Sequence, residues 1–251
     1  MPPARRQDFL SGTAPVDVVL LGDRAQSIMP RIEALRGDPL LQTGDVRIVR
    51  RTPADEGLQE TIIFTSTIAC TVTDVSLVEG QLDAYRACLF HALAFVFVVD
   101  LSGYDDPEST PTSLKASMKQ FEKLCSTTWC TQGVPIIVLF DNEDIFKKKL
   151  AWSSFCLCFP DYAGEDDDAY AAKQYILGCF MAFKMDRYGS IYTHFTSFGD
   201  MHLARVLFAA VQDIVLQHII EDSENPPKSP KSRKACGFSA NLGRLGERWH
   251  N

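Results

Sequence analysis

Cysteine, histidine and acidic side chains are the groups in this chain that could carry chemistry. The eight cysteines are scattered among apolar residues, without a CxxC pair or the Cys/His spacing of a zinc site. His91, His194, His202 and His218 stand alone, and neither a G-x-S-x-G nor an HExxH pattern occurs. The cysteines are therefore interpreted as buried free thiols, and no familiar catalytic set is predicted.

The acidic run 165–168 could in principle bind a metal ion. It is one continuous stretch just before an apolar, helix-like segment. Carboxylates are favoured at helix N-termini, so the run is interpreted as a solvated face at the start of a helix.

Composition narrows the class of protein. The chain has 251 residues, 46% of them hydrophobic, which suits one domain or at most two. A net charge of −7 without a concentrated basic face argues against nucleic acid as the main partner. No apolar run reaches the ~18 to 20 residues of a membrane span, and neither an N-myristoylation signal nor a CaaX box is present. We expect a cytoplasmic protein with no direct membrane anchor, for which membrane residence would need a partner or an acylated internal cysteine.

Strand-like and helix-like segments alternate along the chain. Continuous β-branched and aromatic runs predict strands buried on both faces, and apolar spacings of three and four predict amphipathic helices. Strands separated by helices imply an α/β fold with a mostly parallel sheet. The expected strands are Val16–Leu21, two paired runs within 61–75, Ala94–Leu101, Val134–Phe140 and Ile191–Phe195; the expected helices are 112–130, Asp168–Phe183 and 201–221.

These patterns divide the chain into three parts. Residues 1–15 are predicted to form a short flexible N-terminus, and 16–222 to form one domain. Residues 223–251 are rich in Pro, Lys, Ser and Gly, and predict a disordered basic tail.

Two motifs carry a family resemblance. CFPDYAG (Cys158–Gly164) and IYTHFT (Ile191–Thr196), followed by an amphipathic helix, resemble the Ras-like domain of heterotrimeric G protein alpha subunits. The resemblance implies a Ras-like P-loop NTPase fold with helices on both faces of the sheet, and GTP hydrolysis as the ancestral activity. The resemblance further predicts that two parts of the family are missing, namely the helical domain, for which residues 36–50 are too few, and the long N-terminal helix before Val16.

The phosphate loop of the family is eroded at the matching positions. Against the pattern GxxxxGK[ST], the chain reads GDRAQSIM and keeps only Gly22. Ile28 replaces the lysine, Met29 the magnesium-binding hydroxyl, and Asp23 adds a negative charge. The resemblance therefore predicts that tight triphosphate binding is lost.

Both switch segments also depart from the family. Glu56 stands at the magnesium-binding threonine, and the catalytic arginine would fall near Arg50 or Arg51. After Asp74, the water-orienting glutamine is restored as Gln81 only if three residues are looped out. Glu56 and Asp74 are weak metal candidates, and Gln81 and Arg51 would be catalytic only if hydrolysis is retained.

The base-recognition motifs of the family are only partly retained in this chain. The family motif NKxD aligns with Asp141 to Asp144, where Asp144 retains the carboxylate but the asparagine and lysine are replaced. In the TCAT loop only Thr196 matches. The predicted nucleotide-binding remnants are Gly22, Asp144 and Thr196.

Three hypotheses remain open. The leading one is a pseudo-GTPase that signals through contacts with an effector, a receptor or a beta-gamma-like partner and needs no cofactor. The candidate contact residues are Tyr85, Phe121 and Trp129, although core packing is the favoured interpretation for each of them. The alternative is a divergent alpha subunit with GTPase activity that uses GTP or GDP with Mg²⁺. The third is a decaying duplicate that folds poorly.

Overall fold

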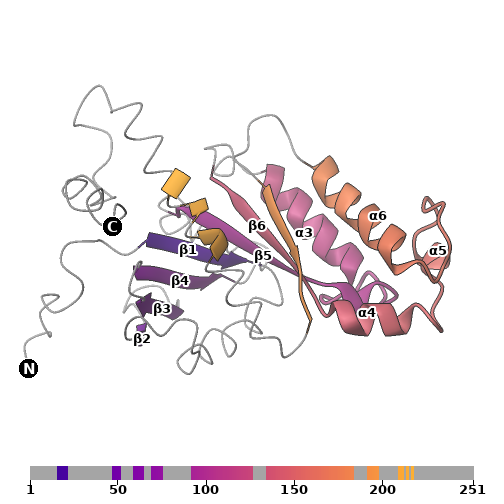
Figure 1. The fold of residues 1–251 in the computed structure, drawn as a ribbon, viewed down its shortest axis with the longest axis horizontal. Helices are drawn as coiled ribbons and strands as arrows, with labels where there is room; N and C mark the ends of the chain where they lie inside the picture. Colours follow the sequence, from indigo (N-terminus) through magenta and orange to yellow (C-terminus); the bar gives the residue numbers. More distant parts are fainter. Residues whose placement is uncertain are drawn as a thin grey trace, which may run out of the picture.

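A single twisted sheet organises the molecule. The computed structural model describes residues 16–21, 47–51, 59–64, 69–75, 92–126, 134–183, 191–197, 209–211, 213–214 and 216–217. Its seven strands lie in the order β2-β3-β4-β1-β5-β6-β7 (Figure 1). Pairing is parallel from β4 through β1, β5 and β6 to β7, and antiparallel between β2, β3 and β4. The mostly parallel sheet predicted from the sequence is confirmed.

The strands fall where the apolar runs predict them. The two runs within 61–75 form the antiparallel pair β3 and β4, and only the edge strand β2 was not expected. The bounds are β1 Val16–Leu21, β2 Arg47–Arg51, β3 Gln59–Phe64, β4 Ala69–Val75, β5 Ala94–Asp100, β6 Ile136–Asp141 and β7 Ile191–Phe195.

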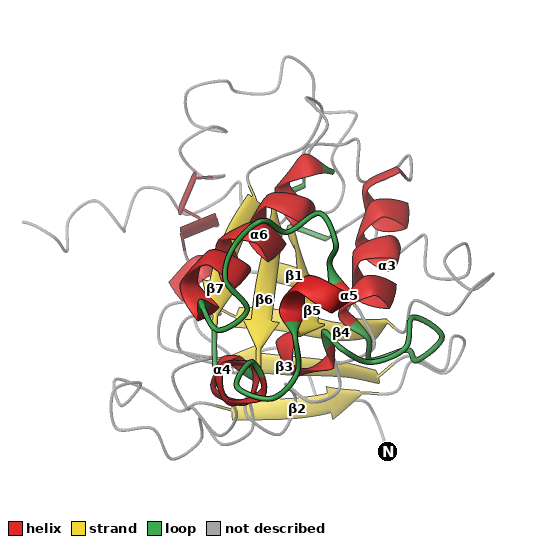
Figure 2. Cartoon of the chain, turned by 90° about the vertical axis from the view of Figure 1, so that its right-hand side faces the viewer, coloured by secondary structure: helices red, strands yellow, loops and turns green. Residues whose placement is uncertain are grey.

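Strands β5 and β6 form the buried centre of the sheet, and every residue of both is buried. Successive side chains of a strand point to opposite faces, so both faces must be covered. One face belongs to an aromatic core in which the Phe180 ring lies 5.1 Å from Phe121 and 5.2 Å from Phe140. Val96 and Leu139 occupy the alternate positions of the same strands, which point to the opposite face of the sheet. They are equally buried but are not part of the aromatic core. Figure 2 shows the twisted sheet together with the helices beside it.

Two long helices supply most of the cover on the aromatic face. Helix α3 (Leu114–Ser126) begins after Ser113, whose Oγ accepts a hydrogen bond from the Ala116 N–H at 3.0 Å. Helix α6 (Ala169–Ala182) begins after Asp168, whose carboxylate accepts the N–H groups of Tyr170 and Ala171. Ser and Asp side chains of this kind satisfy N–H groups that a helix start leaves unpaired. The acidic run therefore does end in a helix N-terminus, as predicted.

Three short elements connect the strands and were not predicted. They are the 3-10 turn η5 (Leu101–Gly103), helix α4 (Glu143–Lys149) and helix α5 (Phe155–Cys158). Of the predicted closing helix, residues 209–211, 213–214 and 216–217 are helical, and Val211 and Ile214 are buried. Other apolar residues of the predicted helix, Leu203 and Leu207, lie outside the described residues, as does His218.

Phe121 is a correction to the predicted contact residues. Its side chain is fully buried between β5 and α6, with ring centroids 5.2 Å from Phe97 and 5.1 Å from Phe180. It falls on the same apolar stripe of α3 that predicted the helix, and that stripe faces the core. A residue enclosed in this way cannot meet a partner, whereas Tyr85 and Trp129 lie outside the described residues.

Candidate functional site

The ends of β5, β6 and β7 meet at the carboxyl edge of the sheet. Asp100 and Asp141, the last residues of β5 and β6, are paired neighbours in the strand register, and both are buried. The chain leaves β7 at Thr196, whose N–H donates to the Phe140 carbonyl at 2.8 Å. Ligands of open α/β sheets bind at this edge, so it is the candidate site.

Thr196 ties the β7 end to the loop between β6 and α4. Its carbonyl accepts the Glu143 N–H at 3.0 Å, and its hydroxyl lies 3.2 Å from the Asp141 carboxylate. The structure therefore brings together the aligned base-recognition residues, including the predicted Thr196 and Asp144. Thr196 itself is 4% exposed, and its hydroxyl is directed at the protein.

Asn142 begins helix α4 in an unusual conformation. Its φ of 61° is in the left-handed region, which asparagine tolerates better than most residues. Its side chain makes no capping hydrogen bond to α4, and its Nδ2 donates instead to Asp100 Oδ1 at 2.8 Å. The same Asp100 oxygen accepts the backbone N–H and the hydroxyl of Ser102 at 2.9 and 2.6 Å.

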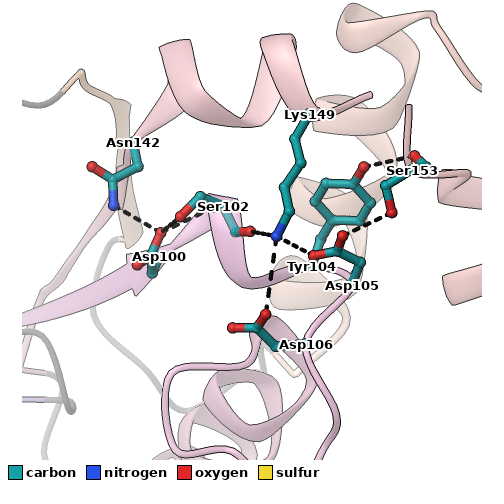
Figure 3. A network of polar contacts seen from close by, with 8 residues as sticks. All are labelled: Asp100, Ser102, Tyr104, Asp105, Asp106, Asn142, Lys149 and Ser153. Carbon is teal, nitrogen blue, oxygen red and sulfur yellow. Dashed lines mark hydrogen bonds and ion pairs between the residues drawn. The ribbon is translucent and has the colours of Figure 1, made fainter. Parts of the chain in front are cut away.

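A polar network continues from Asp100 to the far end of α4 (Figure 3). The Lys149 ammonium donates to the Ser102 carbonyl at 2.8 Å and forms ion pairs with Asp105 and Asp106. Burial acts to raise the pKa of Asp105, but hydrogen bonds from Lys149 and Ser153 outweigh it and hold this pKa below its usual value.

Tyr104 adds a further contact in the same network. Its hydroxyl donates to the Ser153 carbonyl at 2.7 Å, and burial raises the pKa of Tyr104. The loop after β5 is therefore fastened to α4 by contacts within the protein.

A second group of ion pairs connects the start of α4 to α6. Lys173 lies 2.5 Å from the Glu143 carboxylate, Lys147 lies 2.7 Å from it, and the Lys173 ammonium stands 4.8 Å from the centre of the Phe195 ring. Burial acts to raise the pKa of Glu143, but hydrogen bonds from the two lysines outweigh it and lower that pKa. Sequence reasoning missed Lys149 and Lys173, because residues 30 to 47 positions apart in the chain meet only after folding.

The site residues that the structure describes do not all suit the binding of a guanine base. Asp144 Oδ1 is buried and has no hydrogen-bond partner, so it suits an N–H donor of a ligand. An asparagine offers both a donor and an acceptor, whereas the carboxylate of Asp141 only accepts. The amide donor of Asn142, which replaces the family's lysine, is already used by Asp100. No step of a nucleotide reaction can be assigned to this corner.

The remaining predicted site residues cannot be placed as a group. Gly22, Glu56 and Gln81 lie outside the described residues. Arg51 ends β2 opposite Glu60, and Asp74 lies in β4 opposite Leu20 of β1. Within the described ranges, no group of three or more His, Cys, Asp or Glu side chains could hold a metal ion.

The family described as "G-protein alpha subunit" matches residues 40–215. "Guanine nucleotide-binding protein subunit alpha" of Emericella nidulans is 30% identical over 200 residues, which are 78% of this chain and 56% of that protein. "Guanine nucleotide-binding protein alpha-2 subunit" of Mycosarcoma maydis is 28% identical over 178 residues, 70% of this chain and 50% of that protein.

The chain spans about half the length of these curated relatives. Among the helices that the structure describes, none combines the length and apolarity needed to cross a membrane. The match covers most of the sheet, including the motifs before α6 and along β7. On the extent of this match, the chain belongs to the G-protein alpha subunit family.

Proposed function

We propose that this alpha-family chain is a pseudo-GTPase, which signals through protein contacts without a cycle of GTP binding and hydrolysis. The observation that carries the proposal is the β6–α4 loop at the base-recognition corner. There the Asp141 carboxylate is bonded to Thr196, and the Asn142 amide is bonded to Asp100. Of the groups that would read a guanine edge, the asparagine and the lysine are thus replaced by residues engaged within the protein, and the Asp144 carboxylate alone is kept.

The sequence of the phosphate end supports the same proposal. Phosphate binding in P-loop proteins relies on a lysine and on a hydroxyl that holds Mg²⁺, and Ile28 and Met29 stand in their places. A hydrogen bond to a charged group contributes ~1.5 to 3 kcal/mol, so losing several would weaken triphosphate binding by orders of magnitude.

The proposed partners are the protein classes that the family implies, namely an effector, a receptor or a beta-gamma-like protein. We also propose a cytoplasmic location, with contact to membranes made through those partners. The fastened loop after β5 suits such a role, because Lys149 holds it to α4 without a ligand.

A divergent guanine-nucleotide-binding subunit is the second candidate. It is favoured by Asp144, whose buried Oδ1 lacks a donor and stands where the family binds the base. On this reading Asp144 and Thr196 would hold guanine, while Gln81 and Arg51 would serve hydrolysis.

The nucleotide content of the purified protein separates the two candidates. The protein is purified in Mg²⁺, denatured, and its released nucleotides are quantified by anion-exchange chromatography beside a relative that carries the full GxxxxGK[ST] loop. The pseudo-GTPase proposal expects no stoichiometric guanine nucleotide. One GDP or GTP per chain would overturn it and favour the second candidate.

A further inference from the structure

Three large apolar side chains are exposed in the segment from the end of α4 to the start of α6. Leu157 is 83% exposed, Trp152 72% and Tyr170 70%, and no large apolar side chain of the other described residues is as exposed. A single exposed apolar residue is ordinary, but a group of them marks a contact surface.

Asp166 holds this segment together. Its carboxylate accepts the Cys156 N–H at 2.7 Å, so the start of α5 is tied to the loop before α6. Leu157 directly follows Cys156, and Tyr170 lies in the first turn of α6. Both Figure 1 and Figure 2 show α4, α5 and the start of α6 side by side at one end of the molecule. We call this end, with its exposed Trp152, Leu157 and Tyr170, the α5 surface.

The position of Leu157 on α5 explains its exposure. Phe155 and Phe159 lie four positions apart, and both are buried in the core with their ring centroids 4.8 Å from each other. A residue two positions from each of them lies on another side of the helix. The packing of the core therefore does not require a leucine at position 157.

The α5 surface is also acidic. The segment 150–172 contains five acidic residues and no Lys or Arg. Asp166 is engaged by Cys156, whereas no ion pair with a described residue neutralises the other four. Lys148 of α4, the nearest exposed lysine in the sequence, supplies only one opposite charge. A segment that covers this surface must therefore combine apolar side chains with several positive charges. The four exposed carboxylates are those of Asp161, Glu165, Asp167 and Asp168.

The sequence after residue 222 offers both kinds of group. Residues 223–251 contain six Lys or Arg and two Glu, a net charge of +4 with His neutral, although the whole chain carries −7. The glycines at 243 and 246 weaken an isolated helix there, so an ordered conformation would need a surface to pack on. Four apolar residues recur at intervals of four, three and four, the spacing of one helix face: Phe238, Leu242, Leu245 and Trp249.

We propose that the segment 231–249 docks on the α5 surface of its own chain. Its lysine and arginine side chains meet the exposed carboxylates, and its apolar side chains cover Trp152, Leu157 and Tyr170. Gln217 is the last described residue, and Lys231 follows it by 14 positions. An extended chain of that length spans about 48 Å, whereas a domain of about 200 residues is roughly 45 Å wide. The connection is therefore long enough for the contact.

Tethering favours this occupant over a separate protein. A segment on the same chain has an effective concentration in the millimolar range, so a contact with a Kd of about 1 mM between separate pieces would be roughly half formed. No nucleotide takes part, so this inference goes beyond the proposed function and does not rest on it. A partner protein that uses the α5 surface must first displace the segment.

Zero-length cross-linking of the full-length protein tests the contact. A carbodiimide joins lysine amines to carboxylates that touch them, and mass spectrometry identifies the joined residues. We expect intramolecular links from Lys231 or Lys234 to the exposed carboxylates of the α5 surface, and their loss in about 0.5 M salt. The indole N–H signal of Trp152, assigned with Trp152→Phe, should move when Lys231→Glu and Lys234→Glu are introduced together.

A charge exchange ties the links to the two partners. Glu165→Lys with Asp167→Lys should lower the yield of links to the remaining carboxylates by roughly fivefold. Adding Lys231→Glu and Lys234→Glu to that variant should create links between positions 165 or 167 and positions 231 or 234. The control Glu122→Lys changes an exposed carboxylate of α3 and should leave the links of the wild type unchanged.

A second pair of variants tests the apolar part of the contact. Leu157→Ser should lower the yield of the links by roughly threefold or more, because apolar area is no longer covered. Leu216→Ser, at an exposed leucine of the closing helix, is the matched control and should have no effect. All of these side chains are exposed, so each variant should keep the Tm of the wild type.

Three outcomes would overturn the proposal. One is the absence of links from Lys231 or Lys234 to the α5 surface together with an unmoved Trp152 signal, which would leave the surface open to another protein. Another is links that join only two different chains in a mixture of ¹⁴N- and ¹⁵N-labelled protein, which would make a second copy the occupant. The third is an equal yield in Leu157→Ser and the wild type, which would show charge attraction without docking.

Discussion

Asn142 links the backbone, the polar network and the candidate site in one residue. It adopts a left-handed φ of 61°, uses its amide N–H on Asp100 and leaves its oxygen unpaired. Local conformations that cost free energy persist where the surrounding structure holds them, and they gather at functional sites. The sequence shows only that a lysine of the family is replaced by asparagine here. Neither the conformation nor the Asp100 contact could be predicted from that change.

Comparing Asn142→Ala with Asn142→Gly measures the free-energy cost of the left-handed backbone conformation at this position. Both variants lose the same side-chain contacts, but only glycine adopts the left-handed conformation without a steric penalty. We expect Asn142→Ala to be less stable than Asn142→Gly by roughly 1 kcal/mol, measured by urea unfolding. Equal stabilities would show that the loop does not require φ near 61° in solution.

Lys173 allows a test of the electrostatics around the loop. Hydrogen bonds from Lys173 and Lys147 lower the pKa of Glu143, whose side chain is 16% exposed. A carboxylate with a lowered folded pKa stabilises the protein above its unfolded pKa of ~4.3, and this stabilisation is lost as the pH falls through the folded value. Acidification from neutral pH to below ~4 should therefore destabilise the wild type through this group.

Lys173→Met should reduce that dependence. We expect about 1 to 2 kcal/mol lower stability at neutral pH and a smaller further loss on acidification, measured by urea unfolding at several pH values. Lys148→Met is the matched control, because Lys148 lies exposed on α4. If the two variants had the same pH profile, Glu143 would not be held by Lys173 in solution.

At the scale of elements, the loop from η5 to α3 is held by a series of backbone hydrogen bonds. Asp106 N–H donates to the Gly103 carbonyl, Thr110 N–H to Pro107, and Ser113 N–H to Thr110, so the loop is a chain of turns. Lys149 fastens its start to α4, and an ion pair between Lys119 and Glu108 fastens its middle to α3. These contacts support a loop with one conformation.

Gly103 provides the sharpest test of that loop. A Cβ at Gly103 would lie 2.3 Å from the Thr112 carbonyl oxygen, whereas a Cβ at Gly178 of α6 meets nothing within 4 Å. Gly103→Ala should destabilise the protein by about 1 to 3 kcal/mol, because backbone must move. Gly178→Ala should stabilise it by about 0.5 to 1 kcal/mol, because alanine favours the helix. Thermal unfolding of both variants measures the contrast, and a neutral Gly103→Ala would mean that the loop is loosely held.

Elements with a clear period or a continuous apolar run could be predicted from the sequence. Strands β1 and β7 have the bounds that were predicted, and α6 lies within the predicted segment between its capping residues Asp168 and Phe183. Helices α4 and α5 could not be predicted, because seven and four residues are too few to display a helical period. Family analogy made Phe121 a candidate contact residue, but the core packing that was favoured for it is what the structure shows.

At the scale of the whole molecule, the sheet and the helices on one of its faces enclose a packed core. The central strands are buried on both faces, and the aromatic core joins β5, β6, α3 and α6 through Phe97, Phe121, Phe140 and Phe180. A core of this kind supplies hydrophobic stabilisation that does not depend on a ligand. The account therefore expects a stable fold without nucleotide, which the hypothesis of a decaying duplicate does not.

Thermal unfolding of the purified chain, with and without millimolar GDP or a GTP analogue plus Mg²⁺, tests this central claim most directly. A ligand at one hundred times its dissociation constant adds ~2.7 kcal/mol, which raises Tm by several degrees. We predict a cooperative transition whose Tm is the same in all three conditions. A magnesium-dependent rise of several degrees would contradict the account, because it would mean that the chain still binds guanine nucleotide.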